Sequence, residues 1–351
     1  MKYQVASPDL GKKELAYVTQ SLKDGWISWR GPWVERLHRE FAERHNAKYA
    51  VSCTSGTTAL TLALAALGIH EGDEVIVPEF TMVATAWAVT YNNATPVFVD
   101  CDENFLIDVS KIEEKITSKT RAIMPVHVFG RQVDMKKIKE VADKHNLKIV
   151  EDAALAHSFE AQGDVTCYSF FANKIITAGE GGICVTNNRE LADRMFYLRN
   201  MAFDPKHTFL HNELGYNFRM TSLQAALALA QLERLDEFLA KRKQIEGWYN
   251  EGLKDIPEIT IHPPRKILWM YDLSAERKDE LMEFLEKNEI ETRHLFKPMS
   301  MQPMYCKNED YKNTRAYQAS LKGFYLPTYT KLTKRDVKNI CEKIKEFYAR
   351  S

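Results

Sequence analysis

Residues 148–186 are "KIVEDAALAHSFEAQGDVTCYSFFANKIITAGEGGICVT", and three short apolar runs within them decide the fold class. The runs are KIVEDAA at 148–154, TCYSFF at 166–171 and GGICVT at 181–186. None of them alternates regularly between apolar and polar residues, as a strand with one wet face would. Such strands are buried on both faces of their sheet, which is typical of parallel sheets covered by helices. Sheets of this kind bind ligands at the carboxyl ends of their strands.

Short apolar runs and helical patterns alternate in the same way from residue 50 to residue 186. Because strands separated by amphipathic helices form layered structures, we expect an α/β architecture with a mostly parallel sheet. The remaining predicted strands are EVIVPE (74–79), TPVFVD (95–100) and RAIMPVHV (121–128), and the predicted helices are TTALTLALAALG (57–68) and MKKIKEVADKHNL (135–147).

The C-terminal third of the chain has a different pattern. Residues 221–253 form one long helical pattern, with Thr221 as the expected N-cap. From residue 256 onward, short strands and two amphipathic helices (276–288 and 333–349) predict a small α+β unit. We expect the long helix to bridge two domains, which are residues 1–240 and residues 241–351.

Charge and cysteine content limit the classes of partner. The 48 basic residues balance the 48 acidic ones, so no net field favours nucleic acid or an anionic membrane. The six cysteines lack zinc-site spacing and predict reduced thiols, no metal site and a cytoplasmic protein. The sequence has no signal-peptide pattern and no apolar stretch of about 18 residues. We therefore expect small-molecule partners.

Three sequence pieces place reactive groups at predicted strand ends. In "TSGTTAL" (54–60), Gly56 lets the backbone approach closely, and the helix that follows presents free N–H groups that suit a phosphate. Asp152 ends an apolar strand, and Lys174 precedes the glycine-rich turn at 179–182. Each piece alone has an ordinary explanation as a cap, a turn residue or a solvated lysine. Together they are the parts that pyridoxal phosphate (PLP) requires: an amine for a Schiff base, a carboxylate for the ring nitrogen and donors for the phosphate.

The order of motifs along the chain resembles the DegT/StrS family of nucleotide-sugar aminotransferases, which are fold-type I PLP enzymes. The resemblance runs nearly end to end and implies a large domain with a mostly parallel seven-stranded sheet, plus a small α+β C-terminal domain. The motifs that carry it are "SCTSGTTAL", "VPEFTMVATAWAVTYNNATPVFVD", "MPVHVFGRQVDM", "IVEDAALAH", "YSFFANKIITAGEGGICVTN" and "GYNFRMTSLQAALALAQLERLDEF".

The family resemblance implies roles for individual residues. Lys174 is the implied lysine of the covalent cofactor bond and the proton shuttle, and Asp152 is the implied partner of the pyridine nitrogen. Asn217 is implied to reach the cofactor phosphate of a neighbouring subunit, so we expect a homodimer with shared active sites. The other implied cofactor contacts are the phosphate ligands Gly56, Thr57 and Ser169, and Ala154 beneath the ring.

Two positions depart from the family pattern. The ring-stacking position, usually aromatic, is Met82, whose thioether can still pack on a π face. The position three residues after Asp152 is commonly Gln or Glu and lies near O3′ of the cofactor, but here it is Leu155. We expect this change to affect proton transfer without abolishing activity.

Within the family, "DGWIS", "PVHVFG" and "IETR" most resemble the perosamine-synthase branch, which aminates C4 of a nucleotide-linked 4-keto-6-deoxyhexose with L-glutamate as amino donor. The alternatives are a UDP- or dTDP-linked sugar, a 3-keto sugar, and a non-catalytic or regulatory protein on the same scaffold. Each expected substrate contact also has a structural explanation, such as a salt bridge, a solvated helix face or packing. These contacts are Ser28, His211, Arg219, Lys241 and Tyr305. We interpret His157 as a structural hydrogen-bonding residue.

Overall fold

The computed structural model describes residues 1–350 except 205, 207, 208 and 308, and contains two sheets. The larger sheet has seven strands in the order β1-β7-β6-β5-β4-β2-β3. β7 runs antiparallel to both of its neighbours, β1 and β6, and the other neighbouring strands are parallel, which confirms the mostly parallel α/β prediction. The strands are β1 Tyr49–Cys53, β2 Glu74–Pro78, β3 Thr95–Val99, β4 Thr120–Ile123, β5 Lys148–Asp152, β6 Val165–Ser169 and β7 Gly182–Thr186.

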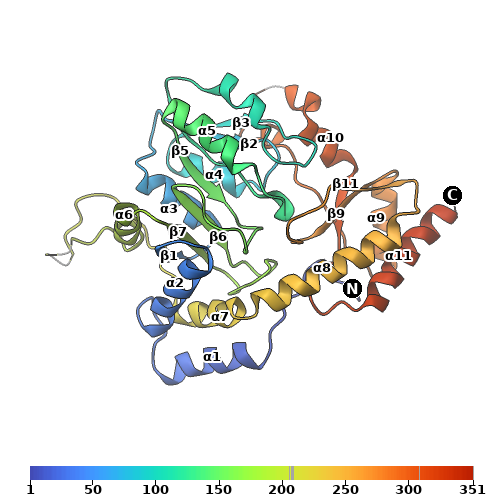
Figure 1. The fold of residues 1–351 in the computed structure, drawn as a ribbon, viewed down its shortest axis with the longest axis horizontal. Coiled ribbons are helices and arrows are strands. Elements are labelled where there is room, and N and C mark those ends of the chain that lie inside the picture. Colours follow the sequence, from blue (N-terminus) through green and yellow to red (C-terminus); the bar gives the residue numbers. More distant parts are fainter. Residues whose placement is uncertain (205, 207–208, 308, 351) are drawn as a thin grey trace.

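Helices cover the larger sheet and bury its central strands (Figure 1). Every residue of β6 and β7 is buried, as their continuous apolar runs predict. None of the helices in the described part of the chain combines the length and apolar character of a membrane span. The covering helices are α2 Pro32–Arg44, α3 Gly56–Ala66, α4 Ala84–Tyr91, α5 Met135–His145 and α6 Arg189–Arg199.

The prediction of a single helix over 221–253 is wrong. Two helices, α7 Ser222–Leu232 and α8 Leu235–Leu253, are separated by Glu233 and Arg234, and Arg234 has φ −105° and ψ 3°. The predicted cap is confirmed, because the Thr221 hydroxyl accepts a hydrogen bond from a backbone N–H in the first turn of α7. The break is stabilised by the N-terminal region, including α1 Lys12–Lys23: the Glu233 carboxylate accepts hydrogen bonds from Lys13, Tyr17 and Arg36.

The C-terminal part of the chain forms an antiparallel sheet in the order β10-β11-β9-β8, with helices against it, as the α+β prediction requires. Helix α8 runs from the larger sheet to this unit and packs against α11 (Figure 1). The predicted division after residue 240 falls inside α8 and stays a prediction. The elements are β8 Ile259–Ile261, β9 Tyr271–Ala275, α9 Lys278–Lys287, β10 Arg293–His294, α10 Arg315–Lys322, β11 Gly323–Leu326 and α11 Lys334–Ala349.

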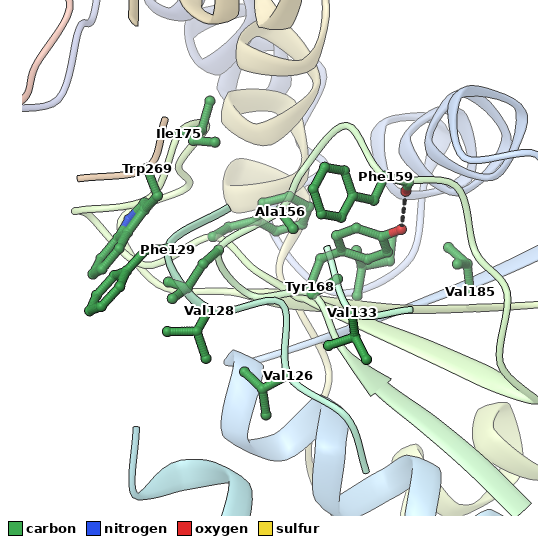
Figure 2. Packing of buried hydrophobic residues seen from close by; sticks show 14 of the residues in the cluster. Val126, Val128, Phe129, Val133, Ala156, Phe159, Tyr168, Ile175, Val185 and Trp269 are labelled. Atoms are coloured by element: carbon green, nitrogen blue, oxygen red, sulfur yellow. Dashed lines mark hydrogen bonds between the residues drawn. The ribbon is translucent and has the colours of Figure 1, made fainter. Parts of the chain in front are cut away.

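A continuous core joins the two units. Trp269, just before β9, packs in one buried cluster with Val126, Val128 and Phe129 from the larger unit (Figure 2). The Trp269 and Phe129 rings are stacked, with centroids 5.8 Å apart and planes 5° apart. The C-terminal unit is therefore packed against the carboxyl edge of the larger sheet.

Buried charges also join the units. Asp272 on β9 is fully buried and accepts hydrogen bonds from Arg131 of the larger unit at 3.0 Å and from Arg265 at 2.8 Å. His262 lies 2.6 Å from the same carboxylate. Nearby Arg265 and Arg131 keep the pKa of Asp272 well below its usual range although burial opposes ionisation. A buried carboxylate with this many partners is costly to replace, because its removal leaves buried Arg131 without a carboxylate partner and Arg265 with Glu246 alone.

Asp272→Asn should lower the free energy of unfolding by about 3–5 kcal/mol, since Arg131 loses its buried counter-charge and Arg265 keeps only Glu246. Urea denaturation measures this loss. The matched control is Asp193→Asn, which breaks an exposed pair with Arg189 on α6 and should cost less than about 1 kcal/mol. Equal effects of the two substitutions would contradict a structural role for the buried cluster.

Candidate active site

Lys174 lies on the loop between β6 and β7, where its side chain enters a cavity of about 280 Å³. The loop is held by backbone hydrogen bonds from Lys174 to Phe171 (2.9 Å) and from Ala178 to Phe170 (2.9 Å). Burial lowers the pKa of Lys174 to about 8, although the Asp152 carboxylate favours its charged form. Roughly a tenth of the Lys174 amines are therefore neutral at pH 7, when a free lysine is almost fully protonated.

The glycine-rich turn after Lys174 is required by close backbone contacts. A Cβ atom on Gly182 would lie 2.2 Å from the carbonyl oxygen of Ser55, at the start of α3. A Cβ atom on Gly56 would lie 2.8 Å from the Cβ of Ser169. Only glycine at these positions allows the lysine loop, the end of β6 and the N-terminus of α3 to meet.

Asp152 closes another side of the cavity at the end of β5. Its side chain accepts hydrogen bonds from the Thr85 hydroxyl (2.8 Å) and from the backbone N–H of Ala154 (3.1 Å). Burial raises the pKa of Asp152, while these hydrogen bonds and the Lys174 charge oppose that rise. The carboxylate is thus fixed in position, and a cationic group in the cavity would favour its ionised form.

The N-terminus of α3 presents backbone donors to the same cavity. Ser55 caps the helix by accepting the N–H of Thr58 at 3.1 Å, and its carbonyl accepts the N–H of Ala59. The N–H groups of Gly56 and Thr57 have no partner within the helix, as at any helix start. Free N–H groups and the helix dipole together make this end suitable for an anion.

Apolar side chains form much of the remaining cavity wall. Met82 and Phe171 are exposed toward it, and Val126 and Leu155 are nearly buried. The Met82 sulfur accepts the N–H of Ala84 at 3.1 Å, which orients the thioether. This wall suits a flat, largely apolar ring between polar groups at both ends.

The structure brings together seven of the eight predicted cofactor residues and leaves one outside. The cavity is lined by Gly56, Thr57, Met82, Asp152, Ala154, Ser169 and Lys174. Asn217 does not line it, but is exposed and forms a β-bridge with Asn200. The roles of these residues in binding stay predictions.

The predicted substrate residues lie outside the cavity. Arg219 borders a separate hollow, with its guanidinium 5.8 Å from the Trp29 ring centroid. The other four are spread over the chain. Ser28 is exposed, and the His211 ring forms a hydrogen bond with the carbonyl of Met201. The Lys241 amine lies over the Trp248 ring, and the Tyr305 hydroxyl forms a hydrogen bond with the Thr90 hydroxyl.

His157 agrees with its structural interpretation. It is fully buried, its ring nitrogen Nε2 donates to the carbonyl of Ser169 at 2.6 Å, and burial lowers its pKa to about 3. Sequence reasoning missed two residues at the site, Thr85 and Trp269. The sequence gave a weak signal for Thr85, because a second threonine, Thr81, lies four residues before it. In the structure their two buried hydroxyls are 3.0 Å apart.

Known proteins share this architecture. Residues 8–345 match the DegT/DnrJ/EryC1/StrS aminotransferase family. The GDP-perosamine synthase of Escherichia coli O157:H7 is 40% identical over 99% of this chain and 100% of its own length. The GDP-perosamine synthase of Caulobacter vibrioides is 41% identical over 97% of this chain and 96% of its own. The Helicobacter pylori PseC structure, an aminotransferase of pseudoaminic acid biosynthesis, superposes with TM-score 0.92 at 26% identity, covering 99% of this chain and 100% of its own.

Lys174→Met should stabilise the cofactor-free protein at pH 7. The unfolded lysine titrates near 10.5 and the folded one near 8, so the unfolded state binds the proton more tightly. The lysine therefore destabilises the fold below pH 8, and this cost disappears as the pH rises to 10.5. We expect a gain of about 1–3 kcal/mol at pH 7 in urea unfolding, shrinking above pH 8.

The matched control for this prediction is Lys119→Met, on an exposed loop, which should change stability little at either pH. A Lys174→Met protein that is less stable than the parent at pH 7 would contradict the account of a lysine held at a desolvation cost.

Proposed function

This chain belongs to the DegT/DnrJ/EryC1/StrS aminotransferase family, and we propose that it is a PLP-dependent enzyme that transfers the amino group of L-glutamate to C4 of a GDP-linked 4-keto-6-deoxyhexose. The observation that carries the proposal is the meeting of Lys174, Asp152 and the N-terminus of α3 in one cavity. The GDP-perosamine synthases that match nearly the whole chain support the sugar and the nucleotide.

The donor set of the cavity fits PLP. The N–H groups of Gly56 and Thr57, with the Ser169 side chain, would hold the phosphate. Asp152 would accept a hydrogen bond from the protonated ring nitrogen. Because Gly56 has no Cβ atom, the start of α3 and Ser169 can lie close together. When bound, PLP supplies an electron sink that stabilises negative charge on the carbon losing its proton.

Lys174 has the properties of the acid and base that this chemistry needs. A group titrating near 8 exchanges protons readily at neutral pH, so the Nζ atom can take a proton from a substrate carbon and return it. Hydrogen bonds from the Thr85 hydroxyl and from the N–H of Ala154 hold the negatively charged Asp152 carboxylate in one position in the cavity. Fixed hydrogen bonds thus orient the carboxylate before any ligand binds.

The apolar wall would keep water from the reacting groups. Met82, Val126 and Leu155 offer no strong hydrogen-bonding group to the cavity, so the polar residues at its ends determine how a ring lies. With PLP bound, Leu155 would offer no hydrogen bond to the 3′ oxygen of the cofactor, whereas the residue usual at this position in the family is polar. We expect slower proton transfer as a result, and no loss of the reaction.

We also propose a homodimer in which each site receives Asn217 from the other subunit. Asn217 follows a segment with exposed apolar side chains: Phe209 is 82% exposed and Leu214 is 94% exposed. Large apolar side chains this exposed are typical of a protein interface. The described part of the segment between α6 and α7 projects away from the sheet (Figure 1), as a segment that reaches a neighbouring subunit would.

Purified protein with L-glutamate and a GDP-linked 4-keto-6-deoxyhexose should yield the amino sugar nucleotide and 2-oxoglutarate, detected by mass spectrometry. UDP- and dTDP-linked 4-keto sugars and a 3-keto sugar should react more slowly.

Asp152→Asn should reduce the rate by about a hundredfold or more with a small change in melting temperature, because the amide carries no charge.

No amino sugar from any of these substrates would contradict the proposed enzyme and favour a non-catalytic protein on this scaffold. Faster product formation from a 3-keto or a UDP-linked sugar would contradict the proposed substrate alone. A melting temperature that falls in parallel with activity in Asp152→Asn would make Asp152 a structural residue.

Shared sites predict recovery of activity when two weakened proteins exchange subunits. In a hybrid of Lys174→Ala and Asn217→Ala chains, one site carries both lesions and the other carries neither. An equal mixture should then regain about a quarter of the parent activity, since half of the dimers are hybrids with one intact site. No recovery despite proven exchange would assign Asn217 to its own subunit.

A further inference from the structure

Trp269 connects the C-terminal unit to the lysine loop. It lies between β8 and β9, and only 2% of it is exposed. Its indole N–H donates a hydrogen bond to the carbonyl of Asn173 at 3.0 Å, and the Lys174 amine lies 5.2 Å from the centroid of its ring. One side chain therefore contacts both the backbone just before the lysine and the amine itself.

The Trp269 ring is itself firmly held. Figure 2 shows it against Phe129, with which it is stacked. The centroid of the Tyr325 ring lies 5.9 Å from the centroid of the Trp269 ring. The Trp269 carbonyl accepts a hydrogen bond from the buried guanidinium of Arg242. Held from both the ring and the backbone, Trp269 has little freedom to move when Lys174 changes its state.

We propose that Trp269 is a positioning residue for Lys174: its ring face holds the ammonium of the free lysine, and its N–H fixes the Asn173 backbone that carries it. The face of an indole ring is electron-rich and attracts a cation within about 6 Å, most strongly where water is excluded. A lysine that is released and re-bonded in each cycle needs such a resting place. This role in the cycle rests on the proposed function, whereas the contact itself does not.

Other groups around Lys174 do not replace this contact. Asp152 favours the charged amine, but its hydrogen-bonding capacity is shared with Thr85 and Ala154. His157 is kept neutral by burial, and Glu180 also borders the cavity. A cation that has lost most of its water thus gains from the ring face in addition to the carboxylate.

The test measures Lys174 in the cofactor-free protein, without substrate or turnover. Acetic anhydride labels the neutral form of an amine, and the labelling of the Lys174 peptide, followed by mass spectrometry from pH 6 to 11, gives its titration midpoint. Trp269→Leu should lower the midpoint by about one pH unit, because the charged form loses the ring. In Trp269→Phe, which keeps a ring face, the midpoint should stay close to that of the parent protein.

The matched control is Trp248→Leu, which removes another lysine–tryptophan contact, 4.6 Å from the Lys241 amine. It should leave the Lys174 midpoint unchanged. A midpoint that Trp269→Leu does not move, or that Trp269→Phe moves as far as Trp269→Leu, would overturn the proposal.

Fluorinated tryptophans inserted at position 269 keep the test informative if Trp269→Leu does not fold. Each added fluorine withdraws electron density from the ring while shape and N–H remain, so the midpoint should fall stepwise with fluorine number. An unchanged midpoint across the series would reduce Trp269 to a packing residue. Because the assay needs no product, its outcome is independent of whether the proposed sugar is the substrate.

Discussion

A lysine amine held in a largely desolvated cavity beside a buried carboxylate is the constraint on which the rest of the structure depends. Water favours the charged amine, so every element that excludes water from Lys174 opposes its protonation. The parallel sheet makes this possible, because β5 and β6 end side by side and deliver Asp152 and Ser169 to the same edge. The chain then passes through Lys174 and a glycine-rich turn into the antiparallel strand β7, so that Lys174 lies in the same cavity as Asp152 and Ser169.

The C-terminal unit completes this environment. Besides Trp269, it contributes Asp272 to a buried charge cluster with Arg131, and Ser300 donates its backbone N–H to Glu79, just after β2, at 3.0 Å. Glu79 and Arg131 both lie in segments that follow strands of the larger sheet, β2 and β4. The orientation of the second unit is therefore part of the site, and a loss of packing there should be felt at Lys174.

Local sequence patterns predicted six of the seven strands of the larger sheet and the helices α3 and α5, and they singled out Gly56, Asp152 and Lys174 in the cavity. The family resemblance supplied the other cofactor residues. Apolar runs identify buried strands. Asp152 ends one of them and Lys174 lies a few residues beyond the next, so both are expected at the carboxyl edge of a parallel sheet. The break at Glu233 was missed because it depends on ion pairs with Lys13 and Arg36, which no local pattern reveals. Trp269 was missed for the same reason, since only the packed fold brings it to Lys174. The substrate contacts stay predictions, because none lines the cavity of a single chain.

The most direct test of the central claim is to reduce the protein, as purified, with borohydride, digest it and locate the cofactor by mass spectrometry. Borohydride makes a lysine–cofactor bond permanent, so the attached group marks the residue that held it. The account predicts a pyridoxyl phosphate group on the peptide that contains Lys174 and none on that peptide in Lys174→Ala. A protein that binds PLP but carries the group on other lysines, with Lys174 unmodified, would contradict it.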